Sequence, residues 1–102
     1  MKFFKDGNGS LCVEWEQAKG HYKRAWIQHK TEWDKDWAES PGGRYLNVVR
    51  CDNKTRNPGG NPTDFPVFCD LSDEQILTAF VATVCAITGC KLPAQLSNPD
   101  TT

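Results

Sequence analysis

Short segments in which apolar and polar residues alternate fill the first half of the chain. Leu11, Val13 and Trp15 occupy every second position of residues 10–16, which is the period of a strand with one buried face. The Asp-Gly-Asn-Gly sequence at residues 6–9 is typical of the turn of a hairpin. Strands are predicted at residues 2–5, 10–16, 21–30 and 44–51.

Polar residues, glycine and proline dominate the segments between and after these strands. Residues 31–43 are predicted to be a polar connection that contains Trp33 and Trp37. Residues 52–64 contain three Asn, two Pro and two Gly, a composition that predicts a flexible loop. Residues 65–69 are predicted to be at most an edge strand, because they contain a proline.

An amphipathic helix is predicted from Ser72 to Gly89. Ser72 is an N-cap residue, and Gln75 completes a capping box three residues later. Gly89 suits the left-handed position that ends helices. Seven apolar residues form a stripe that we expect to pack on the sheet: Ile76, Leu77, Phe80, Val81, Val84, Cys85 and Ile87.

Together these elements predict an α+β fold for a single domain at residues 1–92. An antiparallel sheet of four strands, or five if residues 65–69 pair, forms a meander with one C-terminal helix packed on one face (ββββα). Residues 93–102 are polar and are predicted to be a flexible tail.

The side of the helix opposite its apolar stripe carries no charge, although a solvent-facing helix normally carries Lys, Glu or Arg there. One interpretation is that alanine and threonine are simply exposed to solvent. The other is a contact surface, either for a second copy of the chain or for the connection that holds Trp33 and Trp37. The residues concerned are Thr78, Ala79, Ala82, Thr83 and Ala86.

Composition and cysteine usage narrow the class of protein. Hydrophobic residues make up 38% and charged residues 25% of the chain, which is typical of a folded domain. No apolar run resembles a signal peptide or approaches the roughly 20 residues of a membrane span, so a cytoplasmic protein without membrane association is predicted. The five cysteines include no Cys-x-x-Cys pair and are predicted to be free thiols. A disulfide framework, and a zinc site at Cys69, Cys85, Cys90 and a histidine, are the alternatives.

Catalytic motifs are missing from the sequence. It contains no nucleophile elbow, no Walker-type loop, no His-Glu-x-x-His and no dinucleotide-binding glycine pattern. His21 and His29 are interpreted as surface histidines, and Asp34 and Asp36 as loop residues. We therefore predict no catalytic residues, cofactor or metal, and a small enzyme is the third hypothesis for the function.

Basic residues beside aromatic residues favour a second hypothesis, a single-stranded nucleic-acid-binding protein. Residues 1–62 carry 11 Lys and Arg against 8 Asp and Glu (+3), whereas residues 63–102 carry 1 against 5 (−4). Cations can follow phosphates while rings stack on bases. A net charge of −1 and a pI near 6.1 argue against this hypothesis. The candidate residues are Lys19, Tyr22, Lys23, Arg24, Trp26, Lys30, Arg44, Arg50, Lys54 and Arg56.

The first hypothesis is a small non-enzymatic module that acts through protein–protein contacts. Four tryptophans are many for 102 residues, and Trp33 and Trp37 lie in a polar segment. Tryptophan often anchors interfaces, although these two residues could instead cap one end of the core. Phage-type and mobile-element inhibitors or regulators of bacterial enzymes have this general character. The predicted protein-binding residues are Trp33, Trp37, Ala79, Ala82, Thr83 and Ala86.

Overall fold

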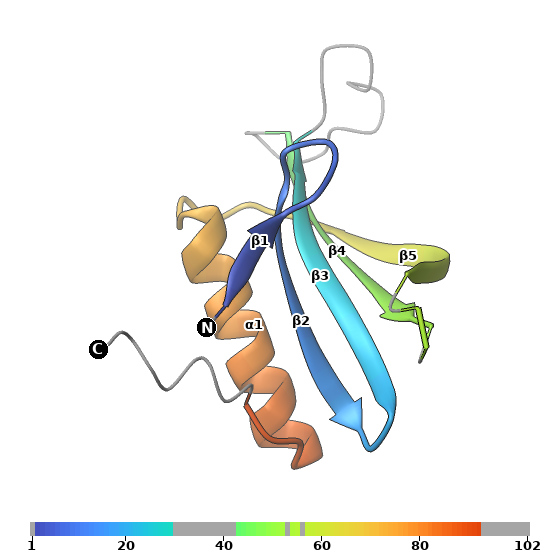
Figure 1. Cartoon of the computed structure of the whole chain (residues 1–102). Coiled ribbons are helices and arrows are strands. Elements are labelled where there is room, and N and C mark those ends of the chain that lie inside the picture. Colours follow the sequence, from blue (N-terminus) through green and yellow to red (C-terminus); the bar gives the residue numbers. More distant parts are fainter. Residues whose placement is uncertain (1, 30–42, 53, 56, 93–102) are drawn as a thin grey trace.

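An antiparallel meander of five strands carries one helix across one face (Figure 1). The computed structural model describes residues 2–29, 43–52, 54–55 and 57–92. Neighbours in the sequence are neighbours in the sheet, in the order β1-β2-β3-β4-β5, and every pair is antiparallel. The predicted α+β fold is therefore confirmed. The elements are β1 (Phe3–Lys5), β2 (Leu11–Ala18), β3 (His21–His29), β4 (Arg44–Cys51), β5 (Pro58–Pro66) and α1 (Asp73–Thr88).

The turn between β1 and β2 forms where the sequence predicts it. The Asp6 carboxylate accepts hydrogen bonds from the backbone N–H groups of Asn8 (2.8 Å) and Ser10 (2.9 Å). The Gly9 N–H donates to the Asp6 carbonyl at 3.0 Å, and Gly9 has a φ of 80°. An aspartate side chain that bonds its own turn and a glycine at positive φ fix this hairpin locally.

Strand β5 corrects the prediction for residues 52–64. Most of β5 lies in the segment that composition marks as a flexible loop, and only residues 65 and 66 belong to the predicted edge strand. Proline has no backbone N–H, and alternate residues of a strand direct this group to the same side. Because the spacing between Pro58, Pro62 and Pro66 is even, the side without N–H groups can be the open edge of the sheet, where no strand pairs. Edge pairing with β4 therefore overrides the loop composition.

A bulge interrupts the pairing of β4 with β5. Val48 pairs with Thr63 and Arg50 with Gly59, so residues 60–62 of β5 oppose Val49 alone. Gly60, at the start of the bulge, has a φ of 77°, which glycine adopts without strain. The bulge bends β5 away from the line of the other strands (Figure 1).

The caps of α1 confirm the predicted ends of the helix. The Ser72 hydroxyl accepts a hydrogen bond from the Gln75 N–H at 3.1 Å, and the Gln75 side chain accepts one from the Ser72 N–H at 2.9 Å. Gly89 has a φ of 80°, and its N–H donates to the Cys85 carbonyl at 2.8 Å. Short-range hydrogen bonds therefore satisfy backbone groups at both ends of the helix.

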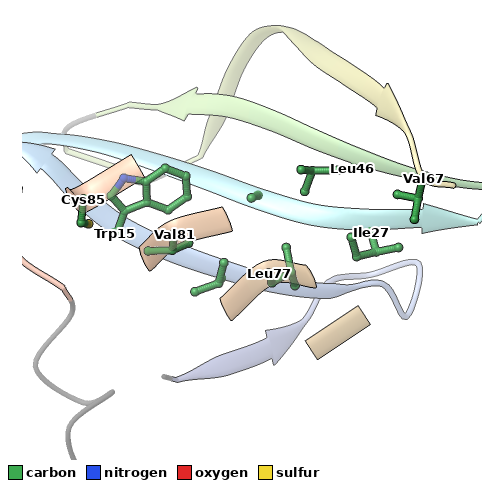
Figure 2. Close-up of a cluster of buried hydrophobic side chains, with 9 residues drawn as sticks. Trp15, Ile27, Leu46, Val67, Leu77, Val81 and Cys85 are labelled. Carbon is green, nitrogen blue, oxygen red and sulfur yellow. The ribbon is translucent and has the colours of Figure 1, made fainter. Parts of the chain in front are cut away.

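The core lies between α1 and the sheet (Figure 2). Leu77, Val81 and Cys85 are the buried residues of the helix, and the Trp15 ring meets the Phe80 ring edge-on at 6.0 Å. The prediction that Ile87 belongs to this stripe is wrong, because its side chain is 79% exposed. At 3.6 residues per turn, Ile87 lies about 120° around the helix from Val81, the centre of the buried stripe.

The other face of the sheet also contains buried residues. Val49 and Asn47 of β4 lie on that face with Cys12 of β2, and all three are buried. Asn47 donates side-chain hydrogen bonds to the Gln28 side chain (3.2 Å) and the Tyr45 carbonyl (3.3 Å). The prediction of one buried face is therefore incomplete, since residues in the middle of the second face are buried as well.

Candidate partner-binding surfaces

A groove runs between α1 and β5 on the face of the sheet that carries the helix. It exists because α1 packs mainly on β2 and β3, so that Arg50 of β4 and Phe65 of β5 remain exposed on that face. The groove consists of two adjoining hollows of about 470 and about 580 Å³. Four residues line both hollows and so join them: Lys23, Arg50, Gly59 and Gly60.

Apolar residues of three different elements line one hollow of this groove. Val48 lies on β4, Phe65 on β5 and Phe80 on α1. Phe65 is 48% exposed, whereas Phe80 is held by its edge-on contact with the buried Trp15. An apolar side chain of a ligand could lose contact with water here without a rearrangement of the fold.

Lys23 and Arg50 stand side by side at the centre of the groove. They are direct cross-strand partners of β3 and β4 and project to the same face. Within the part of the chain that the structure describes, neither side chain has an ion pair or a hydrogen bond. Like charges at directly opposite positions destabilise a sheet. This pair therefore costs folding free energy that a bound anion would recover.

The other basic residues of the predicted nucleic-acid site do not join this pair in one surface. Tyr22, Arg24 and Trp26 alternate with Lys23 along β3 and project from the opposite face of the sheet, although Tyr22 also lines the larger hollow at the end of the strand. Lys19 lies in the turn after β2, and Lys54 in the turn after β4. Lys30 and Arg56 are outside the described residues.

Two of the arginines already have acidic partners within the chain. Arg24 forms an ion pair with Glu14 at 2.6 Å and lies over the Phe4 ring at 5.1 Å. Arg44 forms an ion pair with Asp73 at 2.9 Å and donates to the carbonyls of Cys69 and Leu71. Lys23 and Arg50 differ from these arginines, because neither has an acidic partner among the described residues and the two are adjacent across β3 and β4.

The outer face of α1 is exposed in the single chain, which fits both interpretations of its uncharged residues. Ala79, Ala82, Thr83 and Ala86 are all exposed, and the exposed Ile87 adds a large apolar side chain to the same helix. Trp33 and Trp37, the other residues of the predicted protein-binding set, lie outside the described residues. The structure places the four helix residues together on one surface.

A homodimer through this face stays a prediction, and sedimentation velocity checks it. If the chain dimerises through α1, Ala82→Glu is expected to convert the dimer to a monomer, because it places a charge in an apolar seam. Lys54→Glu, in an exposed turn away from the helix, is the matched control and should leave the dimer intact. A wild-type chain that sediments as a monomer at high concentration contradicts the prediction.

The candidate catalytic side chains are dispersed. His29 forms a hydrogen bond with the Asp73 carboxylate at 2.8 Å, at the end of β3, while His21 is exposed at its start. Burial, followed by the nearby charge of Asp6, raises the pKa of the Cys12 thiol to about 11, so this cysteine stays protonated at neutral pH. No group of three or more His, Cys, Asp or Glu that could hold a metal ion occurs among the described residues.

No family model, curated protein or solved structure matches this chain. No helix among the described residues has both the length and the apolar character needed to cross a membrane.

Proposed function

We propose that this chain is a non-enzymatic protein-binding module whose groove between α1 and β5 holds an acidic segment of a partner protein. The observation that carries the proposal is the cross-strand pair of Lys23 and Arg50, two cations without an acidic partner among the described residues. Carboxylates of the partner would neutralise both charges. A neighbouring apolar side chain of the partner would lie against Phe65 and Phe80.

Several observations favour a peptide over a nucleic acid as the occupant. A single strand needs a row of cations along its phosphates, whereas the described lining of the groove holds two, Lys23 and Arg50. The net charge of −1 is also unlike that of a nucleic-acid-binding domain. Single-stranded nucleic acid is the second candidate, because the rings of Phe65 and Phe80 lie in the same groove as the two cations.

Binding to an array of immobilised peptides tests the proposal. The probes combine zero to four Asp or Glu with one Leu or Phe, and a fluorescent oligothymidine is the competing ligand. We expect selection of peptides that contain both acid and a bulky apolar residue. Arg50→Gln should weaken the best peptide by about tenfold, equivalent to about 1.4 kcal/mol, and Lys54→Gln should not. Tighter binding of the oligonucleotide, or no preference for acidic peptides, contradicts the proposal.

Removing the charge of Arg50 is expected to stabilise the free protein. Arg50→Gln relieves the repulsion with Lys23, and Arg50→Glu replaces it with an attraction. Such cross-strand terms are worth roughly 0.2–1 kcal/mol each, so the free energy of unfolding should rise in the order wild type, Gln, Glu. Urea denaturation measures this order.

Peptide affinity should follow the opposite order in the same three proteins. A cation that serves to bind a ligand is expected to lower the stability of the free protein while it raises the affinity for the ligand. If Arg50 had only a structural role, its substitution would lower the free energy of unfolding and the peptide affinity together. That result would contradict the proposed role.

A further inference from the structure

Cys85 and Cys90 meet at the C-terminal end of α1. Their sulfur atoms are 2.7 Å apart. Gly89, between them in the chain, has a φ of 80° and turns the backbone so that Cys90 folds back on the last turn of the helix. Cys85 is only 5% exposed and belongs to the core, whereas Cys90 is partly exposed. A disulfide bond measures about 2.05 Å, so these sulfurs must approach by only about 0.7 Å to bond.

We propose that Cys85 and Cys90 form a dithiol site that closes to an intramolecular disulfide in exchange with a small disulfide such as oxidised glutathione. The pair is set by the helix cap rather than by a flexible loop, since the Gly89 N–H donates to the carbonyl of Cys85 itself. The Thr88 hydroxyl donates to the Val84 carbonyl at 2.7 Å, and the Cys90 sulfur lies 3.3 Å from the same hydroxyl oxygen. The disulfide would fasten residues 90–92 to the helix.

The reaction proceeds by two thiol–disulfide exchanges. The more exposed Cys90 attacks first, as its thiolate. Its sulfur bonds to one glutathione sulfur, the glutathione disulfide breaks, and the departing glutathione thiolate takes up the proton that Cys90 lost. The Cys85 thiolate then attacks the Cys90 sulfur and displaces the second glutathione thiolate, which takes up the Cys85 proton. Two cysteine thiols are oxidised, and one glutathione disulfide is reduced to two glutathione thiols.

The second exchange should depend on pH. Burial raises the pKa of the Cys85 thiol to about 11, with further contributions from the hydrogen bond and charge of Cys90. Burial persists after Cys90 has reacted, so Cys85 remains largely protonated near neutral pH. Because only the thiolate attacks, ring closure should accelerate as pH rises towards the pKa of Cys85.

Oxidation would also change the end of the outer helix face. A hollow of about 460 Å³ lies there, and a covalent link between two of its lining residues would fix its shape. Its lining residues are Ala82, Cys85, Ala86, Cys90, Lys91 and Leu92. This inference does not rest on the groove, which lies on the other side of α1 and has no cysteine of the pair in its lining.

Thiol labelling of the whole protein tests the proposal. The protein is equilibrated in buffers of varied reduced and oxidised glutathione, quenched with acid, unfolded, alkylated and digested with trypsin. Cleavage after Arg56 and Lys91 releases one peptide that contains Cys69, Cys85 and Cys90. We expect three alkyl groups on this peptide in reducing buffer and one, on Cys69, in oxidising buffer. Three alkyl groups or only glutathione adducts at every ratio would overturn the proposal.

Two variants assign the bond. Cys90→Ser is expected to abolish the disulfide, and Cys69→Ser to leave it unchanged. A disulfide that persists in Cys90→Ser, or disappears in Cys69→Ser, would assign the bond to other cysteines and overturn the proposal. Both substituted residues lie outside the fully buried core, so the variants should fold.

Discussion

Replacing Leu77 with alanine is expected to lower the free energy of unfolding by about 3–5 kcal/mol. Leu77 is fully buried on α1 and projects into the core between the helix and the sheet (Figure 2). Its truncation removes apolar surface from the core and leaves a cavity that the surrounding strands cannot fill. Denaturation in urea measures the loss, and the slope of the transition should not change, because the unfolded chain exposes nearly the same surface.

Ile87→Ala is the matched control on the same helix. Ile87 is as large as Leu77 but 79% exposed, so its replacement should change the free energy of unfolding by less than about 0.5 kcal/mol. Similar losses for the two substitutions would mean that the helix packs on the sheet by a different face. The comparison therefore also tests the corrected extent of the apolar stripe.

The sequence predicts the ends of α1 well because the interactions that form them are local. Ser72 and Gln75 are three residues apart and complete each other's hydrogen bonds, and Gly89 needs only its own backbone freedom. The hairpin at Asp6 is local in the same sense. Elements that are fixed within one turn can be predicted without knowledge of the rest of the fold.

Strand β5 and the groove depend on contacts that are distant in the sequence. The composition of residues 58–66 favours a loop, and only pairing with β4 makes them a strand. Lys23 and Arg50 belong to strands joined by a long connection, so their alignment follows from a register that composition does not reveal. Phe65 and Phe80 meet the groove from β5 and α1. The predicted residue sets contain both cations of the groove and Tyr22, which lines one hollow, but neither Phe65 nor Phe80.

Alternation along β3 explains why the predicted basic set spans two surfaces. Lys23 and Arg24 are consecutive, so they project from opposite faces of the sheet. Sequence proximity groups them, whereas the fold gives Arg24 an acidic partner and leaves Lys23 beside Arg50. Basic residues at odd and even positions of a strand should therefore be assigned to opposite faces of the sheet before a binding surface is predicted.

Arg44→Met is expected to lower the free energy of unfolding by roughly 1.5–3 kcal/mol, the range for hydrogen bonds of charged groups. Arg44 is only 17% exposed, and it ties the start of β4 to the segment that joins β5 with α1. Its guanidinium donates to the Leu71 carbonyl (2.7 Å), the Cys69 carbonyl (2.9 Å) and the Asp73 carboxylate (2.9 Å). Methionine keeps much of the apolar stem and removes all three donors.

The dependence of the free energy of unfolding on acidic pH should also reveal the contact between Arg44 and Asp73. Burial raises the pKa of Asp73, but the hydrogen bonds from His29 and Arg44 and their charges outweigh it, so the pKa lies below its ordinary value of 3.8. A carboxyl with a lowered pKa stabilises the fold above its unfolded pKa, and this stability is lost as pH falls through the folded pKa. In Arg44→Met the pKa of Asp73 should move upward, so the loss on acidification from pH 5 should be smaller than in the wild type.

Urea denaturation between pH 5 and pH 2 measures this difference, with Arg50→Gln as the control that removes a positive charge elsewhere on β4. The control should keep the wild-type dependence on acid, because Arg50 does not contact Asp73 among the described residues. If the free energy of unfolding falls with pH equally in Arg44→Met and the wild type, Arg44 does not stabilise the Asp73 carboxylate.

Two arginines of one strand are thus expected to act in opposite directions. Loss of Arg44, which has an acidic partner, destabilises the fold, and loss of Arg50, which faces another cation, stabilises it.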